Sequence, residues 1–391
     1  MKTFSLSQIA DIERNMIAPN QIPSGSLYVG LEHMTGDGQF EGVRAVDANE
    51  LGSTKFRFEA DHVLYGNLRP YLRKIAQPGF SGVCSTEIIP IRARSGTNAR
   101  YLLHFLRWQR TVDWATSRCT GANLPRLSPT ALAELEVPLP VESAQAKITD
   151  LLDRADCVRR KRRQALRLAD ELVRATFLEM VGPSNPAHAT WSQATIEQLA
   201  ADHRNAMRTG PFGSDLRHSE FVDEGIAVVG IDNAVRNRFA WDERRYITPD
   251  KYENLRRYTV FPGDVIVTIM GTVGRTAVVP DNIPVAITTK HLATITLNQS
   301  VALPDFVALS LRIHPDLVRQ IDERNRGAIM PGLNLGLIKS LSLHLPPIAA
   351  QRDFVKALRE IRAVETRQET AAVDAEFLFA SLQERAFSGG L

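Results

Sequence analysis

The sequence lacks the short motifs that mark the common catalytic and cofactor sites. It contains no G-x-x-x-x-G-K-[ST] phosphate loop, no G-x-G-x-x-G dinucleotide loop, no H-E-x-x-H zinc motif and no G-x-S-x-G nucleophile turn. The [ND]-P-P-[YFW] tetrapeptide of amino-methyltransferases is also missing, and its nearest approach, residues 185–188, reads NPAH. We therefore expect no catalytic residue in this chain and expect that partner proteins supply any chemistry.

Cysteine and long apolar runs are scarce as well. The 3 cysteines form no C-x-x-C pair, and the 9 histidines are scattered without the spacing of metal ligands. We accordingly expect neither a disulfide framework nor a metal site, as is usual in a reducing cytoplasm. No run approaches 18 apolar residues and the first residues form no leader-like apolar segment, which predicts a cytoplasmic protein without a membrane span.

The length of the chain favours several domains, and its small net charge produces no strong overall electrostatic field. The chain has 391 residues, which exceeds the usual size of a single hydrophobic core, and 44% of them are hydrophobic. The formal net charge is only +3, so any binding to a polyanion must rely on local clusters of basic residues.

The most informative feature is an internal repeat. Residues 121–145 read GANLPRLSPTALAELEVPLPVESAQ and residues 327–351 read GAIMPGLNLGLIKSLSLHLPPIAAQ. Without a gap, the identical pairs include Gly121/Gly327, Ala122/Ala328, Pro125/Pro331, Leu127/Leu333, Leu135/Leu341, Leu139/Leu345, Pro140/Pro346 and Gln145/Gln351. Each copy follows a segment rich in predicted strands and precedes a long heptad pattern, so the chain reads as domain, helix, domain, helix.

The two heptad patterns predict helices of about 37 residues, which would span roughly 55 Å each. Together with the repeat, they divide the chain into domains 1–143 and 183–350, and helices 144–182 and 351–391. We expect the helices to pack as an antiparallel coiled coil. Its predicted packing positions are Ile148, Leu151, Ala155, Val158, Arg162, Leu172, Leu358, Ile361, Glu365, Phe379 and Leu382. In that arrangement Arg162 lies opposite Glu365 and Gln368, a polar pairing that would fix the register.

Local patterns within the two domains correspond in order. We predict amphipathic helices over residues 4–16, 101–115 and 196–201, with short strands between them. Residues 29–32 (VGLE) parallel 229–232 (VGID), residues 61–64 (DHVL) parallel 264–267 (DVIV), and residues 85–86 (ST) parallel 288–289 (TT). The fold class is therefore α+β, with two similar mixed α/β domains.

Three loop segments combine basic, amide and aromatic side chains, which suit base edges and phosphates. They lie near residues 67–74, 204–217 and 233–238, and Arg275 and Lys290 are further candidates. The individual candidates are Asn67, Arg69, Tyr71, Arg73, Lys74, Arg204, Arg208, Arg217, Asn233, Arg236, Arg238, Arg275 and Lys290. A purely structural turn is the alternative for each of these loops.

Other basic and aromatic clusters also allow either a structural role or a role in DNA binding. Residues 159–163 read RRKRR, which is either a solvated helix face or a strip that contacts DNA phosphates. Trp108 and Trp114 lie beside Arg107 and Arg110 and fit the domain core better than a platform for stacked bases.

Taken together, the chain resembles the specificity subunit of Type I restriction–modification systems over almost its whole length. The second half carries the clearest pieces: residues 210–214 (GPFGS), 263–274 (GDVIVTIMGTVG), 333–339 (LNLGLIK) and 345–352 (LPPIAAQR). The first half has diverged equivalents of these pieces. None is decisive alone, but they occur in order, and the last pieces recur before each long helix.

The resemblance implies a function. In this family two target recognition domains each read half of a bipartite, asymmetric DNA target, and two antiparallel helices set the spacing between the half-sites. The subunit has no catalytic centre and binds no cofactor itself. It binds double-stranded DNA and two modification subunits, which use S-adenosylmethionine to methylate adenine and recruit ATP-dependent restriction subunits. A self-sufficient DNA methyltransferase or nuclease, and a coiled-coil scaffold with no DNA role, are the alternatives.

Overall fold

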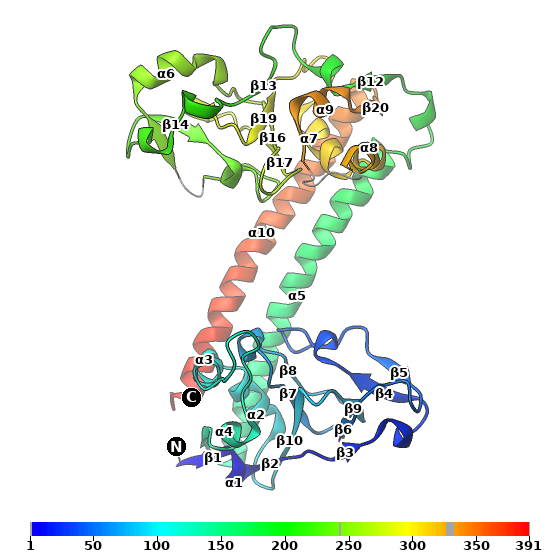
Figure 1. Ribbon diagram of the computed structural model, residues 1–391, viewed down its shortest axis with the longest axis vertical. Coiled ribbons are helices and arrows are strands. Elements are labelled where there is room, and N and C mark those ends of the chain that lie inside the picture. Colours follow the sequence, from blue (N-terminus) through cyan, green and yellow to red (C-terminus); the bar gives the residue numbers. More distant parts are fainter. Residues whose placement is uncertain (1, 242–243, 326–331, 391) are drawn as a thin grey trace. The chain divides into compact units, whose positions relative to one another are not determined.

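The computed structural model describes residues 2–241, 244–325 and 332–390. The chain forms two compact units, the first made of residues 1–164 and 369–391 and the second of residues 165–368. Each unit contains one mixed α/β domain together with segments of the same two long helices (Figure 1). The predicted fold class is confirmed.

The first domain contains three sheets. A two-stranded sheet pairs β1 (Lys2–Ser5) with β11 (Glu136–Leu139). An antiparallel sheet has the order β2-β10-β7-β8, with strands Ala10–Ile12, Ile88–Ala93, Val63–Gly66 and Ile75–Ala76. A mixed sheet has the order β3-β6-β9-β4-β5, with strands Met16–Ile17, Lys55–Phe58, Gly82–Cys84, Ser26–Val29 and Arg44–Val46. In the mixed sheet, β4 and β9 run parallel.

The second domain repeats this arrangement, except that its mixed sheet has three strands in the described residues, where the first domain has five. A two-stranded sheet pairs β12 (Gln193–Thr195) with β20 (Ser342–His344). An antiparallel sheet has the order β13-β19-β16-β17, with strands Met207–Thr209, Leu292–Ile295, Val265–Thr268 and Thr276–Val278. A mixed sheet has the order β15-β14-β18, with strands Arg245–Ile247, Ile226–Val229 and Ala286–Thr288, and β14 and β18 run parallel. The sequence repeat therefore extends to the two-stranded sheet, the antiparallel sheet and the parallel strand pair of the mixed sheet.

Strand register fixes which residues correspond between the domains. Ile91 pairs with Val63 and Ile12 in the first domain, as Ile295 pairs with Val265 and Met207 in the second. The next residue after Ile12 is Glu13, and the next after Met207 is Arg208. Likewise, the residues before the two central strands are His62 and Asp264. This register corrects the sequence alignment by one position, because it pairs His62, and not Asp61, with Asp264.

The corresponding positions hold polar pairs made of different residues. In the first domain the Glu13 carboxylate lies 3.2 Å from His62, and in the second the Arg208 guanidinium lies 2.6 Å from Asp264. His62 and Asp264 also accept equivalent hydrogen bonds from the backbone three residues earlier, at Glu59 and Phe261. The site is thus kept for a buried polar pair, whereas the residues that make it differ.

The three helices predicted within the domains all differ in the structure. Residues 4–16 form one helical turn, α1 (Leu6–Ile9), between β1 and β2. Gln8 caps this turn by accepting from the Ser5 amide, after which Ala10 is extended and the chain pairs with β10. The predicted helix over residues 101–115 is divided into α2 (Ala99–Leu106) and α3 (Gln109–Ser117), because Trp108 has an extended backbone. Residues 196–199 also form a single turn, capped by Thr195 and Gln198.

In the second domain, α7 (Pro304–Ile313) and α8 (Pro315–Asn325) follow the same plan as α2 and α3. The break falls at His314, which is extended because the residue before a proline is sterically excluded from the helical region. The remaining short helices are α4 (Pro129–Ala133), α6 (Pro249–Leu255) and α9 (Leu335–Ser340). Along the chain they precede β11, β16 and β20, respectively.

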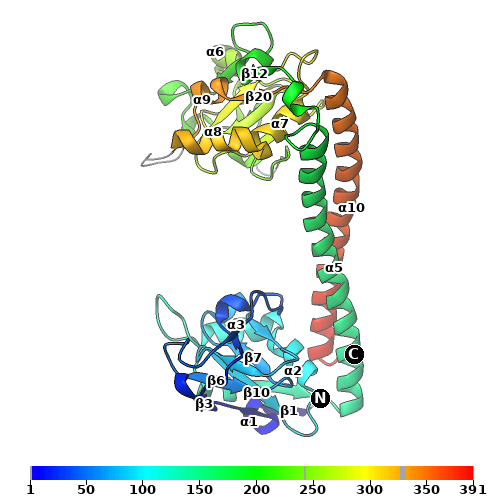
Figure 2. The ribbon, with the colours of Figure 1, turned by 90° about the vertical axis from the view of Figure 1, so that its right-hand side faces the viewer.

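The two long helices are α5 (Glu142–Met180, 39 residues) and α10 (Ile348–Phe387, 40 residues). Both begin two or three residues earlier than predicted. Within each unit their segments lie side by side and run in opposite directions (Figures 1 and 2). In the first unit Arg163 and Arg159 reach Glu376, and Arg159 stacks on Phe379; in the second, Phe177 packs on Phe354.

The repeated glutamine is buried at the start of each long helix and makes the same hydrogen bonds in both domains. Gln145 accepts from the Asn98 amide (2.8 Å) and donates to the carbonyls of Gly96 and Pro140 (2.9 Å each). Gln351 accepts from the Leu303 amide (2.9 Å) and donates to the carbonyls of Val301 (3.1 Å) and Pro346 (2.9 Å). These side chains attach α5 to the start of α2, and α10 to the start of α7.

The predicted packing positions on α5 need a correction. Leu151, Val158 and Leu172 are 37%, 47% and 52% exposed, whereas the residues that follow them, Leu152, Arg159 and Val173, are buried. Heptad counting favoured apolar Val158 over its neighbour Arg159. The structure buries Arg159 because Asp156 neutralises it and its guanidinium lies 4.4 Å from the Phe379 ring.

Other predicted packing residues lie inside the two units. Ile148, Ala155, Leu358, Phe379 and Leu382 are buried, and Ile361 packs at the edge of the second core. Glu365 forms an ion pair with Arg238 of the second domain (3.4 Å). The proposed pairing of Arg162 with Glu365 and Gln368 stays a prediction.

A charged cluster attaches α2 to α5 and predicts acid sensitivity. The Asp153 carboxylate accepts from His104 (2.8 Å) and forms an ion pair with Arg100. Burial alone would raise the pKa of Asp153, but the bonds from His104 and Arg100 outweigh it and lower the pKa to about 2. Because the folded pKa is depressed, Asp153 stabilises the fold at pH values above its unfolded pKa, roughly 3.9. That stabilisation is lost as the pH falls from about 4 towards 2.

In Asp153→Asn the free energy of unfolding should therefore fall less steeply between pH 4 and pH 2, the acid limb of the stability curve, than in the wild type. The measurement is urea unfolding of wild type and variant across this range, followed by circular dichroism. Asp150→Asn is the matched control, because Asp150 lies on the exposed face of the same helix. An unchanged acid limb in Asp153→Asn would show that other carboxylates control acid unfolding.

Candidate nucleic-acid interface

Three loops meet at one edge of the second domain. They are the turn after β14 (Ile231–Asn233), the β16–β17 loop (residues 269–275) and the β18–β19 turn (residues 289–291). The Thr289 amide donates to the Val229 carbonyl (3.0 Å), and the Ile269 amide donates to the His291 carbonyl (2.9 Å). Short connections between buried strands therefore hold this edge in place.

A fourth segment joins this edge through a close backbone approach. A Cβ atom on Gly210 would lie 2.2 Å from the Thr289 carbonyl carbon, so only glycine fits there. This explains the first glycine of the GPFGS sequence. It places Pro211 and the following polar loop, residues 212–218, beside the β18–β19 turn.

The first domain builds the corresponding edge with the same backbone contacts. The Ser85 amide donates to the Val29 carbonyl (2.9 Å), as Thr289 does to Val229. The β7–β8 loop is joined to the turn after β9, because the Asn67 amide donates to the Glu87 carbonyl (2.9 Å). Register also makes Lys74 the equivalent of Arg275, since the Gly66 and Thr268 amides donate to their carbonyls at 2.8 Å.

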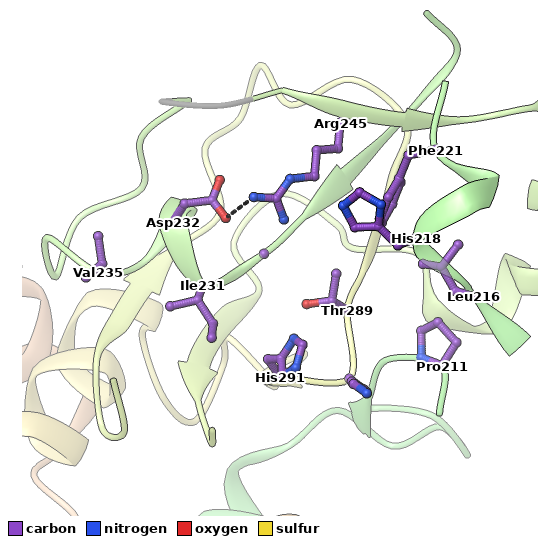
Figure 3. Close-up of a pocket in the computed structure, with 12 residues that line it drawn as sticks. Pro211, Leu216, His218, Phe221, Ile231, Asp232, Val235, Arg245, Thr289 and His291 are labelled. Carbon is purple, nitrogen blue, oxygen red and sulfur yellow. Dashed lines mark ion pairs between the residues drawn. The ribbon is translucent and has the colours of Figure 1, made fainter. Parts of the chain in front are cut away.

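The second-domain edge encloses a pocket of about 540 Å³ (Figure 3). Its lining mixes apolar and polar side chains: Ile231 and Val235 lie on one side with Asp232, and Leu216 and Phe221 lie on the other with His218 (Figure 3). Asp232 faces Arg245 at 3.8 Å, and Lys290 and His291 also line the pocket. Burial, together with the neighbouring Lys290, lowers the pKa of His291. The pocket thus offers hydrogen-bonding groups beside apolar side chains.

Five of the predicted contact residues are exposed and charged in the second domain. They are Arg204, Arg217, Arg236, Arg275 and Lys290. Arg275 and Lys290 belong to the three-loop edge, and Arg217 belongs to the adjoining polar loop. Arg236 follows the turn after β14. Arg204 lies before β13, outside the loops that form the edge.

Two predicted contact residues in the second domain have structural roles instead. Arg208 is 7% exposed, and its guanidinium donates to Asp264, Thr296 and the carbonyls of Thr259 and Asn205. Asn233 is fully buried, where it accepts from the Gly230 amide and donates to the Ala240 carbonyl. The terminal nitrogens of Arg208 and the side-chain amide of Asn233 are bonded inside the domain, so neither residue is available to DNA.

Arg238 also acts within the protein. Its guanidinium pairs with Glu365 of α10 at 3.4 Å and is partly buried. This interaction connects the recognition domain to the long helix in the second unit. We therefore assign Arg238 to domain attachment and not to DNA contact.

In the first domain, Arg69 and Tyr71 are exposed on the β7–β8 loop. Arg69 and Arg73 both have a φ of 52°, which is rare for a residue with a side chain, so the loop is locally strained. Arg73 is bonded to Gln109, and Lys74 donates to the Leu31 carbonyl (2.6 Å). Asn67 is 5% exposed. Sequence reasoning placed all of these on the surface, but only Arg69 and Tyr71 face solvent.

The basic run at residues 159–163 is largely neutralised within the first unit. Arg159 and Arg160 pair with Asp156, and Arg163 pairs with Glu376 (2.6 Å). These contacts favour a structural role over a strip of phosphate ligands. Trp108 likewise packs on Phe105 and Phe387 in the first core, as expected from the sequence.

Sequence reasoning missed Arg245 and His291, which line the pocket. His291 could have been found from its position beside Lys290, in a polar turn between two apolar strands. Arg245 gives no such signal, because it is brought to the edge by β15, which pairs with β14 across a long connection.

The fold defines a class of proteins with two similar mixed α/β domains, each followed by a long helix. Two solved structures of this kind match nearly the whole chain. One is the S subunit of a Type I restriction–modification system from M. genitalium, with a TM-score of 0.61 and 13% identity, covering 99% of this chain and 96% of that one. The other is a chain from a structural study of complex assembly and conformational transition in the type I R-M system. Its TM-score is 0.57 and its identity is 19%, and the match covers 100% of this chain and 98% of that one.

Curated relatives give the same result. The chain is 25% identical over 226 residues to the specificity subunit of the Type I restriction enzyme EcoDI of Escherichia coli, which covers 51% of this chain and 49% of that protein. It is 22% identical over 205 residues to the EcoBI specificity subunit of the same organism, covering 51% and 42%. The matches thus span about half the length of these relatives or less. No family model matches the chain.

The resemblance inferred from the sequence is therefore confirmed: the chain is similar to Type I specificity subunits and has their fold. Among the residues that the structure describes, no helix is both long enough and apolar enough to cross a membrane.

Proposed function

We propose that this chain is a sequence-specific DNA-binding specificity subunit that reads a bipartite, asymmetric target. The observation that carries the proposal is the duplicated three-loop edge. Equivalent backbone contacts build it in both domains, but its side chains differ: Asn67 and Glu87 of the first edge correspond to Ile269 and His291 of the second. Two such edges with different residues suit the reading of two different half-sites.

The proposal includes partners and excludes catalysis by this chain. Two modification subunits would bind it, use S-adenosylmethionine and methylate the DNA, and restriction subunits would join through them in the cytoplasm. Names of the similar proteins support this, since they are specificity subunits of restriction enzymes. The chain itself would bind no cofactor.

Substitution in one domain should affect one half-site. The double variant Arg275→Ala, Lys290→Ala should relax discrimination in the half read by the second domain, and Arg69→Ala in the other half. A base-contacting arginine is worth about 1–3 kcal/mol, so discrimination should fall roughly 5- to 150-fold. The measurement is the methylation motif in the genome of cells that express each variant with the modification subunit.

Arg154→Ala is the matched control, because Arg154 is an exposed cation on the long helix and pairs with the exposed Asp150 four residues earlier. It should leave both half-sites unchanged. Equal relaxation of both halves by the second-domain variant, or a contiguous methylation motif in wild type, would contradict two independent readers. Methylation by the isolated chain would contradict a non-catalytic subunit.

A further inference from the structure

Histidines that are remote in the sequence meet in the second unit. His188 lies after α5, His314 lies between α7 and α8, and His344 lies at the end of β20. The ring centroids of His188 and His344 are 4.7 Å apart, and those of His188 and His314 are 5.9 Å apart. Asp316, at the start of α8, adds a carboxylate.

Donor atoms in this cluster are close enough for a shared cation. One atom each from His188, His314 and Asp316 lies within 4.8 Å of the others. Tetrahedral zinc, with bonds of about 2.0–2.1 Å to nitrogen, requires its ligands roughly 3.4 Å apart. His188 and Asp316 are only partly buried, so small side-chain rotations can close that gap, whereas His314 is fully buried and fixed.

Two imidazole nitrogens in the cluster lack an ordinary partner. The Nε2 atoms of His188 and His314 are buried and accept or donate no hydrogen bond within the described part of the chain. A buried polar group left unpaired costs about 1–3 kcal/mol. The other nitrogen of His314, Nδ1, accepts only a long bond of 3.2 Å from the Asp316 amide. The cluster thus has unused coordinating capacity.

The orientation of the third histidine ring, that of His344, is also fixed. His344 is held through its Nδ1 by the Trp191 carbonyl (2.9 Å). A third imidazole is therefore fixed beside the first two.

We propose that His188, His314 and Asp316 form a binding site for a divalent transition-metal ion of the zinc class, with His344 beside it. Each histidine contributes one ring nitrogen and Asp316 one carboxylate oxygen, a nitrogen and oxygen donor set that suits zinc. The ion would attach the segment after α5 to the start of α8. Its role is structural, and the site does not depend on DNA recognition. The ligands come from separate segments, so no regular spacing in the sequence marks the site.

The test uses the full-length chain without a histidine tag, stripped of metal by chelation and dialysis. Co²⁺ is titrated first, because its visible absorption reports tetrahedral coordination, and Zn²⁺ is then added to displace it. We expect one equivalent per chain and a rise in the melting temperature with Zn²⁺. His188→Ala and Asp316→Asn should each weaken Co²⁺ binding at least about 10- to 100-fold, since even an indirect ligand contact is worth that much.

His203→Ala is the matched control, because His203 is an exposed histidine of the same domain, outside the cluster. It should bind Co²⁺ as wild type does. His188→Ala and Asp316→Asn replace partly buried side chains, and circular dichroism of each metal-free variant verifies that it is folded. Absence of the Co²⁺ spectrum in wild type, or equal binding by wild type, His188→Ala and Asp316→Asn, would overturn the proposal.

Discussion

Arg208→Ala should destabilise the second domain by about 3–5 kcal/mol, the cost of removing one partner of a buried ion pair. The guanidinium lies 2.6 Å from Asp264, and the two side chains are 7% and 1% exposed. Its loss leaves the Asp264 charge buried, along with the carbonyls of Thr259 and Asn205. The measurement is urea unfolding of the full-length chain, with hydrogen exchange to locate the loss within residues 165–368.

A lysine substitution separates the effect of the guanidinium geometry of Arg208 from the effect of its charge. Arg208→Lys keeps the charge but cannot reach all four acceptors, so its loss should be smaller than that of alanine but clearly measurable. Arg154→Ala is the exposed control, with an expected change within about 0.5 kcal/mol, as is usual for solvated pairs. A loss below 1 kcal/mol for Arg208→Ala would contradict a structural role and reopen the assignment of Arg208 to DNA.

Gln351→Ala should cost about 3 kcal/mol, because it leaves one buried amide and two buried carbonyls without their partner. Since Gln145 makes equivalent bonds, Gln145→Ala should cost a similar amount, but in the first domain. Gln351→Glu should be at least as harmful, because the carboxylate would face two carbonyl oxygens. Hydrogen exchange of both variants, read separately in the two units, is the measurement.

Gln164→Ala is the matched control. Gln164 is an exposed residue of α5, and alanine is a better helix former, so no loss is expected. A large loss in only one of the two glutamine variants would show that the repeat does not reflect equivalent roles. Equal small losses would show that water replaces the amide.

The internal repeat and its helices could be predicted because they depend on local patterns. Gln145 and Gln351 stand at a fixed offset from the prolines that precede each long helix, and both satisfy backbone groups near that helix start. The buried positions of α5 were harder to predict from the sequence. Adjacent positions such as Val158 and Arg159 differ by one step around the helix, and the buried one is decided by Asp156 and Phe379.

The alignment of residues 61–64 with 264–267 was wrong by one residue for a related reason. The central strands β7 and β16 are buried on both faces, so their sequences show no alternation that would fix the register. The pairing of Val63 with Ile91, and of Val265 with Ile295, is a contact between distant segments. It was this register that revealed Glu13–His62 and Arg208–Asp264 as equivalent pairs.

The sequence by itself determined that the chain contains two related domains, each followed by a long helix, because helix periodicity and helix starts are encoded over a few neighbouring residues. Only the tertiary structure decided which basic residues face solvent. Arg208 and Arg275 look alike in sequence, but one meets Asp264 from a neighbouring segment and the other meets no such carboxylate in the described contacts. The same holds for His188, His314 and His344, since their convergence depends on packing between segments far apart in the chain.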